Sequence, residues 1–474
     1  MKKKLMRILA MAMVLAICLC ACSKTPSDEG NSGNQSGDQQ QSDNQSGSDQ
    51  QAPSSGERIE VKYWSPYTGT SAEFVQGIID EFNARQDTYT VVMEYNGGYY
   101  DQIAKLQATD TNNLPALCNS SSETVGSYLH SGLIRNVQEF VDADSDYSTE
   151  LYGNLIATYG VDGELIGYPL GLSLSGFFYN VEIFEAAGID PYSLTSMDRI
   201  YDAVIQICEG GYAQYGIAEE HSGIWANYAF AREGFYTTDN ENGATGLPTK
   251  CLYDDNSNGF ADIVAGYYQN WADLAAKGYV YPFGSKIKDD MIPAMGRGEL
   301  AMIVTTNSYR TQASAAAAEN GSHYGFVPMF SATDNGKQTG YCSSGNGFFI
   351  IDNGNAEAQQ GAWEFIKYFT SVDVQLRWDT QTGYLPLYDE IYNSDEYQTF
   401  LAEEENSYIR TLIEALQNAD NSAYYAFVAN NNEYTPAGAT CLEAVINGTP
   451  VEDAIEAMCE TINSSFELYN ATNG

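Results

Sequence analysis

The sequence predicts an α/β protein with two lobes, and three observations point to this fold class. Residues 58–474, about 417 in number, are more than one hydrophobic core normally supports. Strand-like and helix-like segments alternate from residue 59 to residue 118, which favours parallel strands joined by helices. Apolar strands return after residues 167 and 299, so we expect a second α/β unit.

The first 22 residues predict export and a lipid anchor. Three lysines and Arg7 precede an apolar run at residues 8–19, which is shorter than the roughly 20 residues that a membrane helix needs. The run ends in Leu19-Cys20-Ala21-Cys22, which resembles a bacterial lipobox. That resemblance implies a signal peptide and lipobox at 1–22, with acylation (palmitate) of Cys22, which becomes the first residue of the mature chain.

Residues 23–57 predict a disordered tether. They are mostly Ser, Gly, Asn, Gln and Asp, and such a composition cannot bury enough apolar surface to fold. A flexible chain of this length reaches roughly 30 Å. We therefore expect the folded part at the extracytoplasmic face of the cell membrane. The alternative is a plain secreted protein that is cleaved after an alanine.

The charge restricts the partners. The formal net charge is -41, and the basic start of the chain makes the mature part more acidic still. Nucleic acid and anionic lipid surfaces need a basic face, so we expect neither as a partner. We expect a monomer.

The cysteines leave their pairing open. Outside the signal they are widely spaced and form no Cys-x-x-Cys motif, at Cys118, Cys208, Cys251, Cys342, Cys441 and Cys459. Up to three disulfides could form outside the cell, and the sequence does not choose among the pairings.

The first lobe is predicted from local patterns. Residues 59–64 alternate with period two, as in a strand. Thr70 and Ser71 offer a cap for a helix that ends at Asn83, residues 88–95 are strand-like, 101–109 helical, and 115–118 a short strand. In parallel sheets ligands bind beyond the carboxyl ends of strands. The first site candidates therefore follow these strands: Ser65, Tyr67, Tyr99, Tyr100, Ser120, Ser122 and Glu123.

The second unit is predicted in the same way. Residues 167–179 form an apolar strand, followed by a helix that starts at Asn180 and stops at Gly188. Further strands are expected at 299–305, 324–329 and 347–352. Polar Thr306-Asn307-Ser308 is followed by a predicted helix through Ala318, and another helix is expected at 356–368. The rest of the chain is predicted to be mostly helical.

Several motifs of catalysis or metal binding fall short. The segment Gly171-Leu172-Ser173-Leu174-Ser175-Gly176 is close to the Gly-x-Ser-x-Gly motif around the nucleophile of hydrolases. Its second glycine comes one position too late for that motif. The three histidines show no spacing for a triad or a metal, so we expect no catalytic or metal-binding residue and no cofactor. Residues 254–262 match half of a calcium loop, but the twelfth position is Ala265, which favours a turn and helix cap. A pair of catalytic carboxylates, as in a glycosidase, stays an open alternative because Asp and Glu are abundant.

The aromatic content suggests a sugar site. The chain has 36 Tyr, 19 Phe and 5 Trp, and aromatic faces stack on sugar rings while polar side chains bind the hydroxyls. For Trp271 and Trp363, on predicted helices, the core is the favoured place. Trp225, in a loop with glycine, is an equal candidate for core and site.

The order of these segments resembles family 1 extracellular solute-binding proteins, the receptor subunits of ABC importers. The matching pieces span nearly all of residues 59–468: Lys62-Tyr63-Trp64, Asp80-Glu81-Phe82-Asn83, Gly98-Tyr99-Tyr100-Asp101-Gln102, Tyr168-Pro169-Leu170, Phe178-Tyr179-Asn180, Gly296-Arg297-Gly298-Glu299-Leu300-Ala301-Met302, Gly345-Asn346-Gly347 and Thr382-Gly383-Tyr384-Leu385-Pro386. The glycerol-3-phosphate-binding branch is most similar, through Tyr100 and residues 383–386.

The resemblance implies site residues. Those expected to line the cleft are Tyr100, Ser122 or Glu123, Ser173, Ser308, Gly345 and Tyr384. The branch holds its phosphate with a C-terminal arginine, and Phe427 aligns with that position here. Without a guanidinium a buried phosphate lacks its strongest partner. We therefore expect a neutral sugar that stacks on Tyr100, Trp225, Tyr384 and Phe427, with its hydroxyls held by Glu123, Ser173 and Asn346.

The resemblance also implies the architecture and the role. It is a two-lobed, periplasmic-binding-protein-like fold of class II with a ligand cleft between the lobes. Lobe 1 is expected at 58–172 plus 308–352 and lobe 2 at 176–305 plus 356–474, with crossings near 172–176, 305–308 and 352–356. The implied role is capture of a neutral mono- or oligosaccharide for an ABC permease and its ATPase. The alternatives are a receptor for glycerol-3-phosphate, another phosphodiester or polyol phosphate, or a peptide, and an exported glycosidase.

Overall fold

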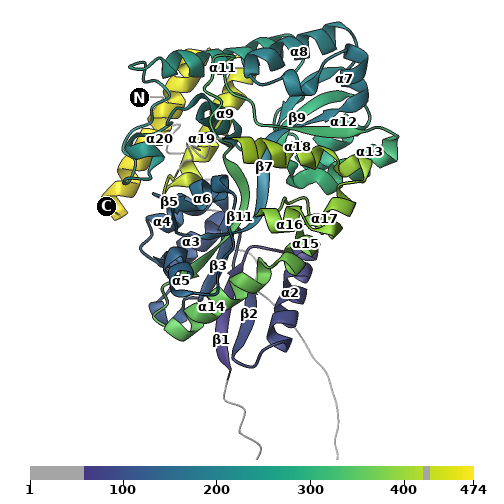
Figure 1. The fold of residues 1–474 in the computed structure, drawn as a ribbon. Helices are drawn as coiled ribbons and strands as arrows, with labels where there is room; N and C mark the ends of the chain where they lie inside the picture. The colour runs from purple at the N-terminus through teal and green to yellow at the C-terminus, as the bar shows by residue number, and fades with distance from the viewer. Residues whose placement is uncertain (1–57, 420–426, 474) are drawn as a thin grey trace, which may run out of the picture. The chain divides into compact units, whose positions relative to one another are not determined.

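A computed structural model describes residues 58–419 and 427–473 of this chain (Figure 1). The predicted signal peptide, the lipobox with Cys22 and the tether at 23–57 lie outside the described residues. In the part that the structure describes, no helix combines the length and the apolar character that a membrane span requires.

The first lobe is built on parallel strands. β1 (Ile59–Ser65) pairs in parallel with β2 (Tyr89–Tyr95) and with β3 (Leu117–Ser121), so the predicted parallel arrangement of these strands is confirmed. α2 (Gly69–Ala84) connects β1 to β2 and buries one apolar face, including Ile78 and Phe82. The helix begins slightly earlier than predicted, because Thr68 rather than Thr70 or Ser71 is its N-cap.

β7 (Tyr168–Asn180) joins the two lobes, because its partner strand changes halfway along. Up to Leu174 it pairs with β11 (Ser343–Ile351), and from Ser175 it pairs with β9 (Leu300–Thr306). All of β7 is buried, which explains its long apolar run. We call the strands β2, β1, β3 and β11 with their helices the first lobe, and β9 and β8 (Tyr215–Glu219) with theirs the second. Figure 1 shows β7, beside β11, running between these two groups.

The remaining helices and strands complete the two lobes. They are α3 (Tyr99–Gln107), α4 (Val125–Leu129), β4 (Ile134–Arg135), α5 (Val137–Ala143), α6 (Gly153–Tyr159), β5 (Gly160–Val161), β6 (Glu164–Leu165), α7 (Val181–Ala187), α8 (Met197–Glu209), α9 (Ile224–Glu233), α10 (Asp239–Asn242), α11 (Phe260–Ala276), α12 (Ile292–Gly296), α13 (Arg310–Asn320), β10 (Tyr324–Pro328), α14 (Ala356–Phe369), α15 (Val372–Gln381), α16 (Asp389–Tyr392), α17 (Asp395–Phe400), α18 (Tyr408–Asn418), α19 (Asn431–Ile446) and α20 (Val451–Asn473).

The packing of two segments differs from the expected lobe limits. β10 pairs with the second half of β7 and α13 packs on α12, so the chain stays in the second lobe after β9 instead of crossing at 305–308. α14 packs against β1, β2 and β11, which keeps it in the first lobe, so there is no crossing at 352–356. The chain returns to the first lobe between β10 and β11, because these strands bond to opposite halves of β7.

Local signals in the second lobe act as predicted. Asn180 caps α7 by accepting a hydrogen bond from the N–H of Ile183, and Gly188 ends that helix in the left-handed region, at φ 68°. Gly259 stands at the start of α11, in agreement with the predicted turn and helix cap. Trp271 and Trp363 are fully buried, which confirms their core placement.

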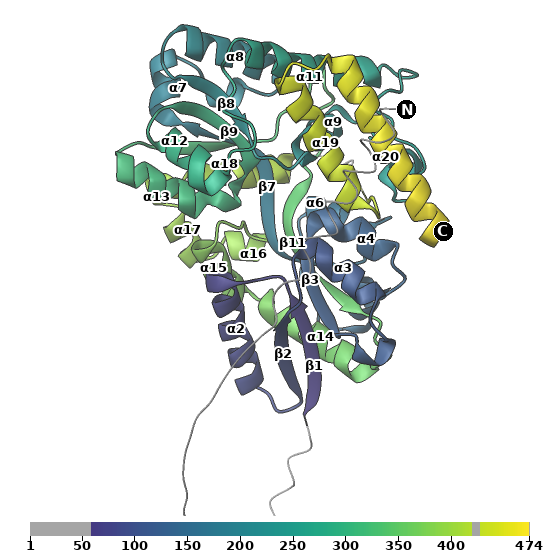
Figure 2. The same cartoon turned by 180° about the vertical axis from the view of Figure 1, so that it is seen from behind.

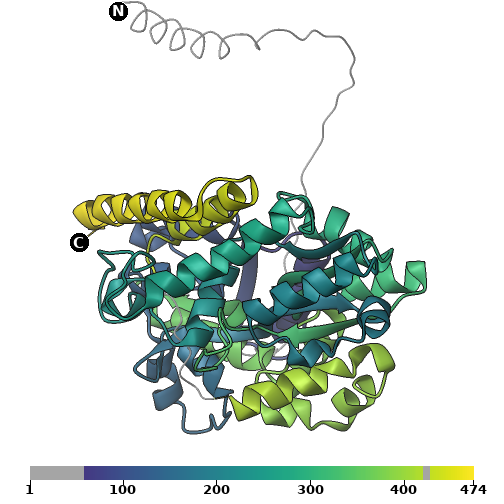
Figure 3. The ribbon, with the colours of Figure 1, turned by 90° about the horizontal axis from the view of Figure 1, so that it is seen from above.

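The C-terminal helices pack on the second lobe. α19 and α20 lie side by side and both contact α11 (Figures 2 and 3). All six cysteines in the described part of the chain carry free thiols, and two of them lie close together. The Sγ atoms of Cys251, before α11, and Cys459, on α20, are 3.2 Å apart.

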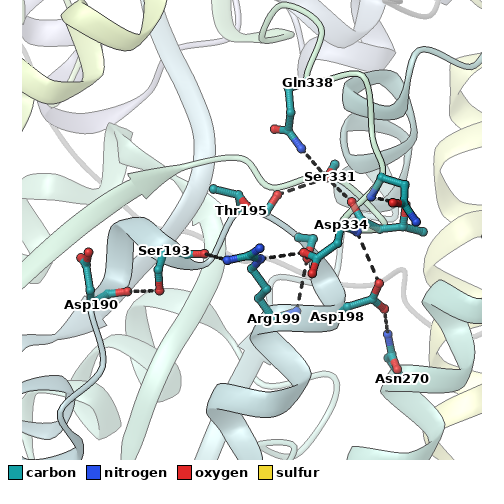
Figure 4. A network of polar contacts seen from close by, with 12 residues as sticks. Asp190, Ser193, Thr195, Asp198, Arg199, Asn270, Ser331, Asp334 and Gln338 are labelled. Atoms are coloured by element: carbon teal, nitrogen blue, oxygen red, sulfur yellow. Dashed lines mark hydrogen bonds and ion pairs between the residues drawn. The ribbon is translucent and has the colours of Figure 1, made fainter.

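A polar network holds the segment that leaves β10 against the second lobe (Figure 4). Asp334 accepts a hydrogen bond at 2.7 Å from Nε of Arg199 on α8, and Asp198 accepts one at 3.1 Å from Asn270 on α11. The Ser331 hydroxyl donates to the Thr195 carbonyl at 3.1 Å. The start of the connection between β10 and β11 is therefore held to α8 of the second lobe. We expect the backbone angles that change in a relative motion of the lobes to lie later in this connection.

Candidate functional site

One cavity of about 310 Å³ lies where the strand ends of the two lobes meet. Its lining residues come from both lobes and from the segment after α15: Tyr99, Tyr100, Ser121, Ser122, Glu123, Ser173, Glu220, Ser222, Trp225, Thr306, Ser308, Tyr309, Ser344, Gly345, Asn346 and Tyr384. Larger hollows, of about 630, 740 and 1070 Å³, lie elsewhere, mainly beside helices and the segments that connect them. The position at strand ends makes the smaller cavity the candidate site.

The first lobe contributes the residues that follow β3 and those that open α3. β1 and β3 are parallel, so their carboxyl ends share one edge of the sheet, and Ser122 and Glu123 come directly after that edge. The hydroxyl of Tyr100 donates a hydrogen bond to the Glu123 carboxylate. Burial raises the pKa of Glu123; the Tyr100 hydrogen bond opposes this rise, and the charge of Glu220 adds to it.

The second lobe contributes Glu220, which follows the last residue of β8. Its carboxylate accepts hydrogen bonds from Thr305 Oγ1 at 2.7 Å and from the Tyr309 hydroxyl at 2.8 Å. The indole N–H of Trp225 donates to the backbone carbonyl of Glu220 at 3.0 Å. Glu220 is thus held in a defined orientation at the carboxyl end of a parallel strand.

The strands that link the lobes complete the floor of the cavity. Asn346 Nδ2 donates to the hydroxyls of Tyr384 at 2.7 Å and Tyr67 at 2.9 Å, and the Tyr384 ring stacks on Trp378 with 5.5 Å between centroids. Gly345 has φ 124°, and a Cβ there would lie 2.2 Å from the carbonyl oxygen of Gly171. Only glycine fits this close approach of β11 to β7.

The structure brings nine of the ten predicted binding residues to this one cavity: Tyr100, Ser122, Glu123, Ser173, Trp225, Ser308, Gly345, Asn346 and Tyr384. Their role in binding stays a prediction. Phe427 does not line the cavity; its ring is 5% exposed and its backbone N–H donates to the Asn242 carbonyl at 2.7 Å. Phe427 packs against Gly126 of α4, where an added Cβ would lie 2.2 Å from its carbonyl carbon.

Sequence reasoning missed several lining residues, of which Glu220 and Tyr309 are the most informative. β8 (Tyr215–Glu219) was not predicted, so the residue after its carboxyl end was not among the expected site residues. The apolar pair Ile217-Ala218 followed by two glutamates was the available signal. Tyr309 directly follows Ser308, which was predicted, at the end of β9.

The lining is acidic and aromatic. Among the described residues that form it there are two carboxylates, four tyrosines and one tryptophan, and no Lys, Arg or His. Lys288 lies nearby, with Nζ 5.6 Å from the centroid of the Tyr309 ring, but it is exposed and outside the lining. No group of three or more His, Cys, Asp or Glu in the described residues is placed to hold a metal ion. Flat rings beside hydroxyl, amide and carboxylate groups suit reversible binding of a small hydroxylated molecule.

Comparison with known proteins agrees with this geometry. Residues 77–402 match the family model described as bacterial extracellular solute-binding protein. The sn-glycerol-3-phosphate-binding periplasmic protein UgpB of Yersinia pestis is 26% identical over 361 residues, which cover 72% of this chain and 77% of that protein. Among solved structures, the sugar-binding protein MalE of Xanthomonas citri has a TM-score of 0.69 at 15% identity, covering 87% of this chain and 99% of that one.

UgpB of Mycobacterium tuberculosis, solved in complex with glycerophosphocholine, has a TM-score of 0.65 at 19% identity, covering 87% of this chain and 99% of that chain. At these identities the solved structures show the shared fold, while the family model covers more than half of the chain. The chain therefore belongs to the bacterial extracellular solute-binding proteins, with the two-lobed α/β fold that its sequence predicted.

Proposed function

We propose that the protein is the ligand-capturing component of an ABC importer and that its ligand is a carbohydrate. The observation that carries this proposal is the cavity itself, in which Tyr100, Trp225, Tyr309 and Tyr384 meet serine, amide and carboxylate groups. Aromatic faces stack on the C–H faces of sugar rings, and the polar groups accept or donate hydrogen bonds to ring hydroxyls.

Binding would close the two lobes over the ligand. β7 and the connection between β10 and β11 link the lobes, and hinge-type closure needs only a few residues in such links to change their backbone angles. The closed form would then be recognised by the permease subunits, whose ATPase drives transport. Anchoring by acylated Cys22 would keep the receptor near them.

A phosphate ligand is the second candidate, because the relatives include proteins named for glycerol-3-phosphate and a structure with glycerophosphocholine. The charge of the cavity argues against it. A phosphate would lie near the carboxylates of Glu123 and Glu220, with no Arg or Lys in the described lining to compensate it.

Isothermal titration calorimetry of the mature protein tests the two candidates. The ligands are a panel of mono- and disaccharides, sn-glycerol-3-phosphate and glycerophosphodiesters. We expect a sugar to bind and the phosphates to give no heat. Tighter binding of a phosphate than of every sugar would refute the carbohydrate proposal. Chromatography of oligosaccharides after incubation tests the glycosidase alternative, since a receptor releases no product.

A further inference from the structure

Two carboxylates face the cavity from opposite lobes. Glu123 follows β3 in the first lobe and Glu220 follows β8 in the second, and both line the same space. Burial is the main cause of the raised pKa of Glu123, and the charge of Glu220 on the other side of this space adds to it. Closure of the lobes over a ligand would bring two like charges into a drier environment, where their repulsion grows.

The protein supplies neutral donors to these carboxylates and no cation in the lining. Tyr100 donates to Glu123, and Thr305 and Tyr309 donate to Glu220. A carboxylate has about four acceptor positions on its two oxygens, so both groups keep capacity for a ligand. Neighbouring Glu219 adds no charge at neutral pH, because burial raises its pKa to about 8.

Two serine hydroxyls of the lining have no hydrogen-bond partner within the described residues. Ser344 is 7% exposed and lines the cavity, yet its Oγ has no hydrogen-bond partner within the described residues. Ser121, which also lines the cavity, has a buried Oγ in the same condition. Buried hydroxyls are rarely left unpaired, so both serines are available to hydrogen-bond a polar group of a ligand in the cavity.

We propose that the ligand carries a protonated amine, which lies between the carboxylates of Glu123 and Glu220, on a hydroxylated ring such as that of an amino sugar. This inference rests on the proposed function and replaces the neutral sugar that the sequence led us to expect. The volume, about 310 Å³, lies at the lower end of the ~300–1,000 Å³ range of small-molecule sites and favours one or two rings.

The physical reason is charge compensation. A neutral sugar can donate hydroxyls to both partly buried carboxylates but brings no positive charge to them. An ammonium group between them turns the repulsion across the lobes into two charge-assisted hydrogen bonds, which favour the closed form. The faces of Tyr100 and Trp225, which line the same cavity, also favour a cation over a neutral group.

Calorimetry on matched sugars tests this inference. Each set holds a neutral sugar, its 2-amino form and its N-acetylated form: glucose, galactose and cellobiose with their glucosamine, galactosamine and glucosamine-disaccharide counterparts. Titrations run at about pH 6, where an aliphatic amine is protonated. We expect at least one amine to bind about tenfold or more tightly than both of its neutral counterparts, and Glu220→Gln to remove most of that preference.

Matched variants keep the result interpretable. Glu123→Gln tests the other carboxylate, and Glu414→Gln removes one exposed charge on α18, far in sequence from the lining, as the control for net charge. Thermal unfolding of each variant shows that it is folded. If each neutral sugar binds as tightly as its amine, or more tightly, the amine proposal is refuted. The carbohydrate receptor proposal is not affected by that result. Binding of glycerol phosphates alone, or of no sugar in any form, overturns both proposals.

Discussion

Replacement of Glu219 by glutamine should stabilise the protein, and increasingly so at high pH. Glu219 ends β8 next to the site, is 3% exposed, and its Oε2 has no hydrogen-bond partner in the described part of the chain. Desolvation is the main cause that raises its pKa from 4.5 to about 8, and the charge of Glu220 adds to it. In the folded protein the group therefore stays protonated at neutral pH, whereas in the unfolded chain it is ionised.

The magnitude follows from linkage between proton binding and folding. Between pH 4.5 and 8 the folded state holds a proton that the unfolded state has released, so the free energy of unfolding falls as the pH rises. One pKa unit corresponds to about 1.4 kcal/mol, so this group costs about 3 kcal/mol at pH 7 and about 5 kcal/mol above pH 8. Glutamine has nearly the same shape and does not titrate, so the variant avoids that cost.

Urea unfolding of the wild type and of Glu219→Gln at pH 5, 7 and 9 measures the effect. The difference in free energy of unfolding should grow by about 4 kcal/mol from pH 5 to pH 9, because all other titrating groups are shared. Glu414→Gln, at an exposed position, serves as the charge control. A difference that stays constant over this pH range would refute the assignment of a protonated Glu219.

Three further outcomes are expected. Tyr384→Ala should lower the affinity for the sugar about tenfold or more, since the ring that stacks on Trp378 beside the cavity is lost, while Tyr384→Phe should keep most of it; calorimetry measures both. Gly345→Ala should lower the thermal unfolding midpoint, because a Cβ would lie 2.2 Å from a backbone oxygen at φ 124°, and an unchanged midpoint would contradict this geometry. Mild oxidation with oxidised glutathione should join Cys251 to Cys459, whose Sγ atoms are 3.2 Å apart, so that peptide mass spectrometry finds this pair linked and the variant Cys459→Ser unlinked.

Much of the first lobe could be predicted because its signals are local. The alternation in residues 59–64 and the helical spacing of Ile78 and Phe82 are set by neighbours in the chain, and β1 and α2 form there. Ser122 and Glu123 could be placed at the site from one general rule, that ligands lie beyond the carboxyl ends of parallel strands. The family resemblance supplied the more distant residues Gly345 and Tyr384.

Other features could not be read in this way. Glu220 follows β8, which was not predicted, and Glu123, which lines the same cavity, is almost a hundred residues earlier in the chain. Phe427 was assigned to the site by alignment alone, and the structure packs it against Gly126 instead. The connection between β10 and β11 has no pattern that marks it as the return to the first lobe.

Composition, periodicity and caps in this chain thus predicted many of its strands and helices, since those preferences act over a few residues. The tertiary structure decided to which lobe each segment belongs. The lobes separate where the partner strand of β7 changes from β11 to β9, between Leu174 and Ser175. Hydrogen bonds between distant strands carry no local imprint in the sequence. For the same reason, the position of Glu123 and Glu220 around one cavity, on which the proposed charge of the ligand rests, became visible only once both lobes were folded.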